Sequence, residues 1–150
     1  MRNNAVTLSP AHLQLKVIEI TAERNLGNKI SASGIVGYGG SGGATIFEIG
    51  AQAAYVLFGD FDDCVKVGVE GVYIGGSAAA GSISSSVTGF QAGPFLGFKT
   101  AADFGLTFEF DLGVDHYFIS GEAKVGTTSV NTVNQSKNIP LVNLQLGWSF

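Results

Sequence analysis

The last segment of the chain alternates strictly between apolar and small or polar residues, and it ends on an aromatic residue. Between residues 138 and 150 the even positions Val142, Leu144, Leu146, Trp148 and Phe150 are apolar, separated by Asn143, Gln145, Gly147 and Ser149. Successive side chains of a strand point to opposite faces of its sheet, so this pattern predicts a strand with one apolar and one polar face. Such a strand lies between two different surroundings. The fold depends on which of them touches the apolar face.

Charged residues are too scarce to cover a water-exposed outer surface. They make up 13% of the chain, against about 25% in a typical soluble domain, and 22 of the 150 residues are glycine. The polar faces are therefore built mainly of glycine, serine and glutamine, which suit the narrow interior of a small cylinder. This composition favours a barrel whose apolar face meets lipid over one whose apolar face is a core.

The same alternation recurs along the whole chain. Seven long segments show it, at residues 12–24, 30–39, 44–57, 64–76, 87–100, 104–118 and 138–150. Outer-membrane barrels of a single chain have an even number of strands, so the short segment 3–9 is expected to be a first strand that closes the ring. We therefore predict one all-β domain over residues 1–150, an eight-stranded antiparallel up-and-down transmembrane β-barrel.

Link lengths and aromatic residues predict how this barrel is oriented. The short links 25–28, 59–63 and 101–103 are expected to be periplasmic turns, and the longer segments 75–86 and 120–137 to be extracellular loops. Two aromatic girdles are expected at the membrane interfaces. The outer girdle comprises Tyr38, Phe47, Tyr73, Tyr117 and Phe118, and the inner one Phe58, Phe61, Phe98, Phe104, Trp148 and Phe150.

Charged side chains on the polar faces are expected to meet inside the barrel, because carboxylates are unfavourable against lipid. These residues are Lys16, Glu19, Glu48, Lys66, Glu70, Lys99, Glu109 and Asp111. An eight-stranded barrel has room only for its own side chains, so we expect a network of paired charges that plugs the lumen. A conducting path for small solutes is the alternative.

The C-terminal run resembles a known bacterial signal. Its alternating residues Leu144, Leu146, Trp148 and Phe150 look like the insertion signal of outer-membrane β-barrels, which the barrel assembly machinery recognises. As a whole the chain resembles small barrels of the OmpA/OmpX type, close to uncharacterised outer-membrane proteins that begin with an Asn-Ala-Val-x-Leu-x-Pro stretch, here residues 4–10. The resemblance implies a monomer integral to the outer membrane of a Gram-negative bacterium. It implies no particular activity.

Several other classes of function are disfavoured. The net charge is −4 without a basic cluster, so nucleic acid is not expected to bind. The single Cys64 has no neighbours at metal-ligand spacing, no loop has the regular Asp or Asn spacing of a calcium site, and no cofactor is expected. A soluble lipocalin-like barrel stays open as an alternative, and it requires the phenylalanines to line an internal cavity.

An enzymatic barrel is a further alternative because His116 and Ser120 share a face near the outer rim. Barrels that deacylate lipid A carry a His-x-Ser spacing and a carboxylate that orients the histidine. Here the spacing differs, and Glu109 and Asp115 are predicted to point the other way. The sequence therefore predicts no catalytic residue.

Overall fold

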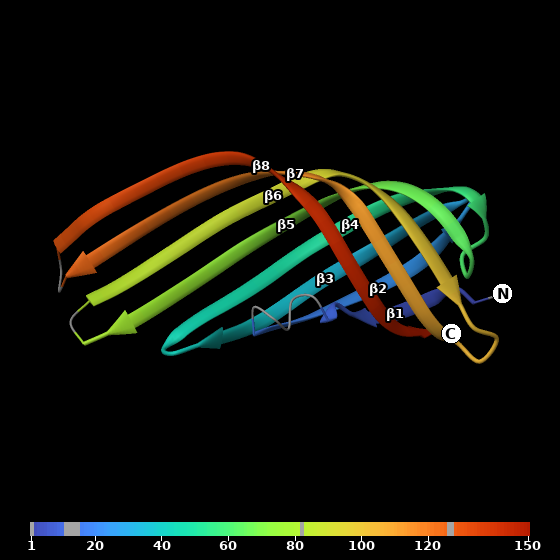
Figure 1. Cartoon of the computed structure of the whole chain (residues 1–150), viewed down its shortest axis with the longest axis horizontal. Helices are drawn as coiled ribbons and strands as arrows, with labels where there is room; N and C mark the ends of the chain where they lie inside the picture. Colours follow the sequence, from blue (N-terminus) through green and yellow to red (C-terminus); the bar gives the residue numbers. More distant parts are fainter. Residues whose placement is uncertain (1, 11–15, 82, 126–127) are drawn as a thin grey trace.

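The chain folds into a closed antiparallel β-barrel, as predicted. The computed structural model describes residues 2–10, 16–81, 83–125 and 128–150. Each strand pairs with the next, and the last pairs with the first (Figure 1). The strands are β1 (Asn4–Leu8), β2 (Val17–Gly27), β3 (Ile30–Ser41), β4 (Ala44–Gly59), β5 (Cys64–Ala80), β6 (Ile83–Ala101), β7 (Leu106–Val125) and β8 (Thr128–Ser149).

The ring closes where the short β1 meets the end of β8, a contact that we call the closing seam. Ala5 pairs with Ser149 and Leu8 with Leu146. At the chain ends, the Asn4 N–H donates to the Phe150 carbonyl at 3.0 Å, and the Phe150 N–H donates to the Asn4 carbonyl at 2.8 Å. The expectation that a short first strand completes the barrel is confirmed.

Both chain ends lie at one end of the barrel, which we call the terminal rim (Figure 1). The links after β2, β4 and β6 turn at this rim. The first is a two-residue hairpin turn in which Asn28 and Lys29 both have positive φ, at 53° and 65°, as a type I′ turn requires. In the second link, Asp60 Oδ1 accepts hydrogen bonds from the N–H groups of Asp62 and Asp63.

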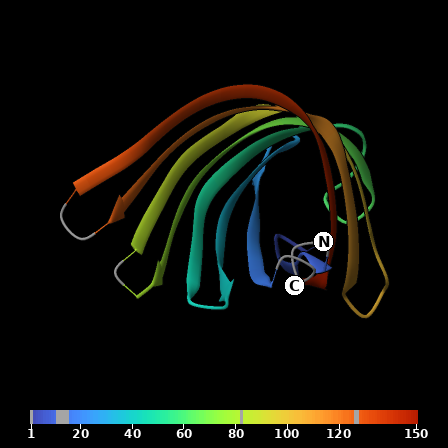
Figure 2. The ribbon, with the colours of Figure 1, turned by 60° about the vertical axis from the view of Figure 1, so that its left-hand side comes forward.

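Strand length grows steadily along the chain, from 5 residues in β1 to 22 in β8. At the far rim, β5 to β8 therefore extend beyond β1 to β3 as a curved sheet (Figures 1 and 2). The expectation that residues 75–86 and 120–137 form loops is wrong, because most of them belong to paired strands. Residues 83–88 are all exposed. A serine-rich segment can therefore pair as a strand without an apolar face, because its side chains are compatible with water on both sides.

The bulky apolar side chains point outward and the polar ones inward. In the described part of the chain, nine buried residues are hydrophobic and nineteen are polar or charged. The exposed apolar residues encircle the barrel, and every strand contributes at least one. Examples are Val6, Ile20, Val36, Ile49, Val69, Leu96, Leu112 and Val142. The predicted orientation of the faces is confirmed.

The closing seam yields a test of the ring. β1 lies so close to β8 that a Cβ at Gly147 would overlap the Val6 carbonyl oxygen, whereas a Cβ at Gly34 meets nothing within 4 Å. We expect Gly147→Val to lower the free energy of unfolding by about 1 to 3 kcal/mol because of this overlap. Gly34→Val is the matched control and should have little effect. Urea unfolding of both refolded variants makes the comparison, and equal stabilities would contradict the close approach of β1 to β8 at the seam.

Candidate functional site

Four charged side chains meet inside the barrel toward the terminal rim. Glu23 of β2, Lys66 of β5, Lys99 of β6 and Glu109 of β7 form this group, which we call the lumen cluster. Lys66 Nζ lies 3.0 Å from Glu23 Oε1 and 2.5 Å from Glu109 Oε1, and Lys99 Nζ lies 2.6 Å from Glu23 Oε2. Each of these residues is at most 6% exposed. Each pair joins an ammonium to a carboxylate, so its hydrogen bond is charge-assisted, and its burial keeps it away from bulk water.

The lumen cluster spans the full width of the ring. β2 and β6 are four strands apart in the barrel, so they lie on opposite sides of it. The Glu23 to Lys99 pair therefore joins opposite walls, and Lys66 and Glu109 fill the space beside it. This arrangement obstructs the lumen at that level.

Two further groups hold the lumen cluster in place. The Ser31 hydroxyl donates to Glu23 Oε1 at 2.7 Å. Lys99 Nζ lies 3.5 Å from the centre of the Phe61 ring, a cation–π contact. Phe61 was expected in the inner aromatic girdle, and this expectation is wrong, because its ring is only 5% exposed. The link after β4 instead brings the ring over the lysine.

A second polar group lies further from the terminal rim. Glu70 accepts hydrogen bonds from the Gln52 and Gln91 side-chain amides, at 2.9 and 3.3 Å. Asp111 and Asp115 are also buried, at 0% and 1% exposed. In the described part of the chain, the buried residues include six carboxylates but only two lysines. The interior is therefore acidic.

The closing seam has its own polar lining. Thr7 donates a hydrogen bond to Gln145, and Ser9 Oγ donates to Asn143 Oδ1 at 2.7 Å. These bonds join the inner face of the last strand to β1 and to the residue that follows it. They add side-chain hydrogen bonds on the lumen side to the backbone pairing of the closing seam.

Most of the charged residues predicted for the lumen lie there. Glu19, Lys66, Glu70, Lys99, Glu109 and Asp111 are buried. Glu48 is half-buried. Lys16 is exposed just before β2, with a positive φ of 58° that turns the chain there, so its expected burial is wrong. The predicted insertion-signal residues Leu144, Leu146, Trp148 and Phe150 all point outward.

Glu23 is central to the lumen cluster and was missed from the sequence. The alternation in β2 is enough to predict that Glu23 points inward, because Glu19, Thr21 and Glu23 share the inner face of this strand. What the sequence could not give was its partner. Ion pairs across a barrel depend on strand stagger, which a single strand does not encode.

No match was found to a protein-family model, a curated protein or a solved structure. Among the described residues, no group of three or more His, Cys, Asp or Glu side chains is arranged to hold a metal ion. In the same part of the chain, no helix is long and apolar enough to cross a membrane.

The lumen cluster predicts unequal effects of two lysine substitutions. Lys66→Met leaves Glu109 without its ion-pair partner in a buried site, so the free energy of unfolding should fall by about 3 to 5 kcal/mol. Lys124→Met removes a pair with Glu122 whose side chains are 46% and 37% exposed, and should cost less than about 1 kcal/mol. Urea unfolding measures both. Adding Glu109→Gln to Lys66→Met should restore part of the loss, and no restoration would contradict the pairing.

Proposed function

We propose that this chain is an integral outer-membrane β-barrel whose lumen is closed and whose role is structural or carried by its surface. The observation that supports this most strongly is the inverted distribution of side chains. Large apolar residues encircle the outside, while ion pairs and hydrogen-bonded side chains fill the inside. Exposed apolar surface on this scale is typical of contact with lipid and unusual on a soluble monomer.

The height of the apolar surface fits a bilayer. On β7, outward apolar residues run from Leu106 to Phe118. At roughly 3.3 Å per residue, this is about 40 Å along the strand. For a strand tilted by about 45°, the height is about 28 Å, close to the apolar band of about 25 Å in known outer-membrane barrels. We call this surface the outer band.

The alternative functions receive less support. A lipocalin-like binder requires an apolar cavity, but the buried residues of the described chain are mainly polar, and Phe61 and Phe95 are the only aromatics among them. A small-solute channel requires an open path, but the Glu23 to Lys99 pair joins opposite walls. A plugged barrel agrees best with both observations.

The single tryptophan provides a direct test of lipid contact. Trp148 is 48% exposed on the outer face near the terminal rim. In vesicles of phospholipids brominated on the acyl chains, its fluorescence should be quenched, most strongly by bromines near the ester end of the chain. A Trp148→Phe, Leu112→Trp variant moves the indole to the middle of the outer band, and deeper bromines should then quench it more.

Two results would contradict the proposal. One is fluorescence that bromine leaves unchanged at both tryptophan positions. The other is a folded protein that stays monomeric and soluble without detergent, which would favour the lipocalin-like alternative.

The closed lumen predicts an electrically silent barrel. Wild-type protein in a planar bilayer should give no stepwise conductance, because the Glu23 to Lys99 pair joins opposite walls. The double substitution Glu23→Ala, Lys99→Ala removes this connection and should admit small ions. Unboiled samples on a detergent gel check that both proteins are folded, and conductance steps from folded wild type would support the channel instead.

A further inference from the structure

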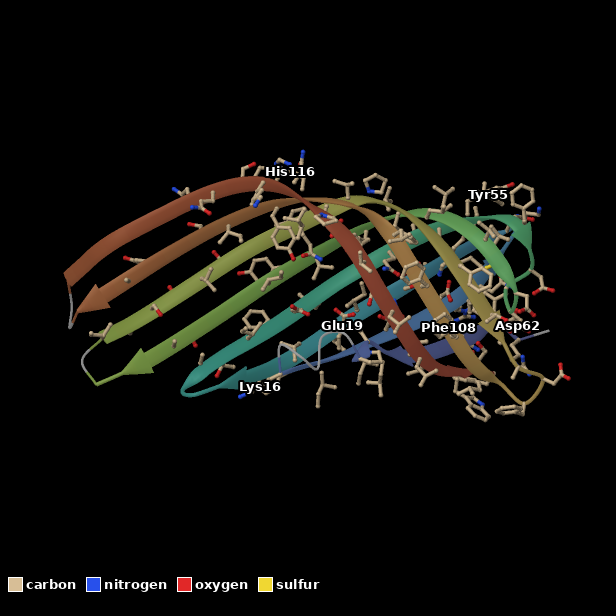
Figure 3. The ribbon with its side chains drawn as sticks, viewed as in Figure 1. Lys16, Glu19, Tyr55, Asp62, Phe108 and His116 are labelled. Carbon is tan, nitrogen blue, oxygen red and sulfur yellow. The ribbon has the colours of Figure 1, made fainter. Side chains whose placement is uncertain are left out.

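A serine, a histidine and an asparagine are hydrogen-bonded to one another on the outer face of β7 and β8. His116 Nε2 lies 2.8 Å from Ser136 Oγ, and His116 Nδ1 lies 2.6 Å from Asn138 Oδ1. His116 is paired directly with Asn138, and Ser136 lies opposite the next outward residue of β7, Phe118. Figure 3 shows the histidine on the outer side of the sheet, away from the lumen.

The two hydrogen bonds are compatible with one tautomer. An amide oxygen only accepts, so the bond to Asn138 Oδ1 places the ring hydrogen on Nδ1. Nε2 then carries a lone pair and accepts the Ser136 hydroxyl hydrogen. A nucleophile bonded to a base that a third group orients is the arrangement of serine hydrolases. The Phe118 ring, at 4.5 Å between ring centroids, packs edge-on against the imidazole and steadies it.

A surface pocket of about 460 Å³ opens beside Ser136. Tyr73, Phe90 and Phe118 supply apolar and aromatic walls. Thr88, Ser120 and Asn134 line the same pocket and carry hydroxyl or amide donors. The pocket therefore combines space for a hydrocarbon chain with groups able to bond a carbonyl oxygen.

The location suits an ester at a lipid interface. On β7 the outward residues between His116 and the terminal rim are apolar, such as Leu112 and Val114. Those between Phe118 and the far rim are polar, at Ser120 and Glu122. Ser136, His116 and Asn138, which we call the outer triad, thus lie at the border of the outer band. In an amphiphilic ester, the ester bond lies at the corresponding border between the apolar chain and the polar head.

We propose that Ser136, His116 and Asn138 form an acyl-ester hydrolysis site for amphiphiles with a long hydrocarbon chain. This activity goes beyond the proposed function and does not depend on it, because detergent micelles can present the substrate. Ser136 is the nucleophile, His116 is the general base and Asn138 is a positioning residue. The sequence expectation of no catalytic residue was argued from His116 and Ser120, a different serine.

The reaction balances with water as the second reactant. Ser136 Oγ attacks the ester carbonyl carbon, and its hydrogen passes to His116 Nε2. The bond from that carbon to the leaving alcohol oxygen then breaks, and the alcohol takes the hydrogen from His116. Water then gives a hydrogen to His116 and attacks the acyl carbon. The bond from that carbon to Ser136 Oγ breaks, Oγ takes the hydrogen back from His116, and the carboxylic acid is released. The donors of Ser120 and Asn134 stabilise the negative oxygen formed at each attack.

The test uses the full chain refolded in detergent micelles, with folding checked by the mobility of unboiled samples on a gel. A fluorescent fluorophosphonate should label the folded wild-type protein at Ser136, and 4-methylumbelliferyl palmitate should be hydrolysed. Ser136→Ala should abolish the labelling, and both Ser136→Ala and His116→Ala should slow hydrolysis at least about 100-fold. Ser84→Ala, at an exposed serine outside the pocket, is the matched control and should keep wild-type rates.

The pH–rate profile tests whether Asn138 positions His116, because a mere loss of structure would lower the rate without shifting this profile. Asn138→Leu should lose most of the activity. Asn138→Asp keeps the acceptor, so it should retain activity, with its pH–rate profile moved to higher pH because a carboxylate favours the charged imidazole. An unshifted profile, or equal activity of the Leu and Asp variants, would overturn the role of Asn138. Folded wild type that neither reacts with the probe nor hydrolyses the ester would overturn the site as a whole.

Discussion

The closing seam is the contact on which the rest of the structure depends. β1 contributes only five residues, yet it pairs with β2 on one side and with the last residues of β8, from Leu146 to Ser149, on the other. Without β1 the sheet would have two free edges. The unpaired backbone N–H and C=O groups of a free edge are costly in hydrocarbon, and in water they can pair with another chain. The lumen cluster also requires the ring, because Glu23 reaches Lys99 only when β2 and β6 are held on opposite sides of one cylinder.

The ions of the lumen cluster are stabilised because they are paired and because the lumen has room for their side chains. Burying an ion costs several kcal/mol, and a short ion pair with further hydrogen bonds offsets this cost. Space comes from glycine: a Cβ at Gly97 would meet Asp111 and Lys66, and one at Gly68 would meet the Phe95 ring. Glycine is therefore abundant on the inner faces because bulky or charged side chains from neighbouring strands occupy the room beside it.

The alternation of residues predicted the strands, their faces and the short β1, since an apolar outer face and a polar lumen create a strong contrast along each strand. Beyond the outer band most residues are small or polar on both faces, so the contrast weakens, and the sequence predicted loops where β5 to β8 are paired. Phe61 and Lys16 were misplaced for a related reason. Each lies where the period of two ends, in a link or at a residue with positive φ, and no pattern there assigns a side.

The outer triad depends on a single irregularity in pairing that the sequence does not reveal. Near the far rim Lys124 pairs with Ser129, but Ala123 pairs with Asn131, so β8 contains one extra residue. From that bulge onward His116 is opposite Asn138, and the even-numbered residues of β8 share its outward face. With the tighter register continued, His116 would be opposite Lys137, and Ser136 and Asn138 would point inward, because a one-residue slip reverses every side chain. The bulge thus sets the register that places the serine beside the histidine.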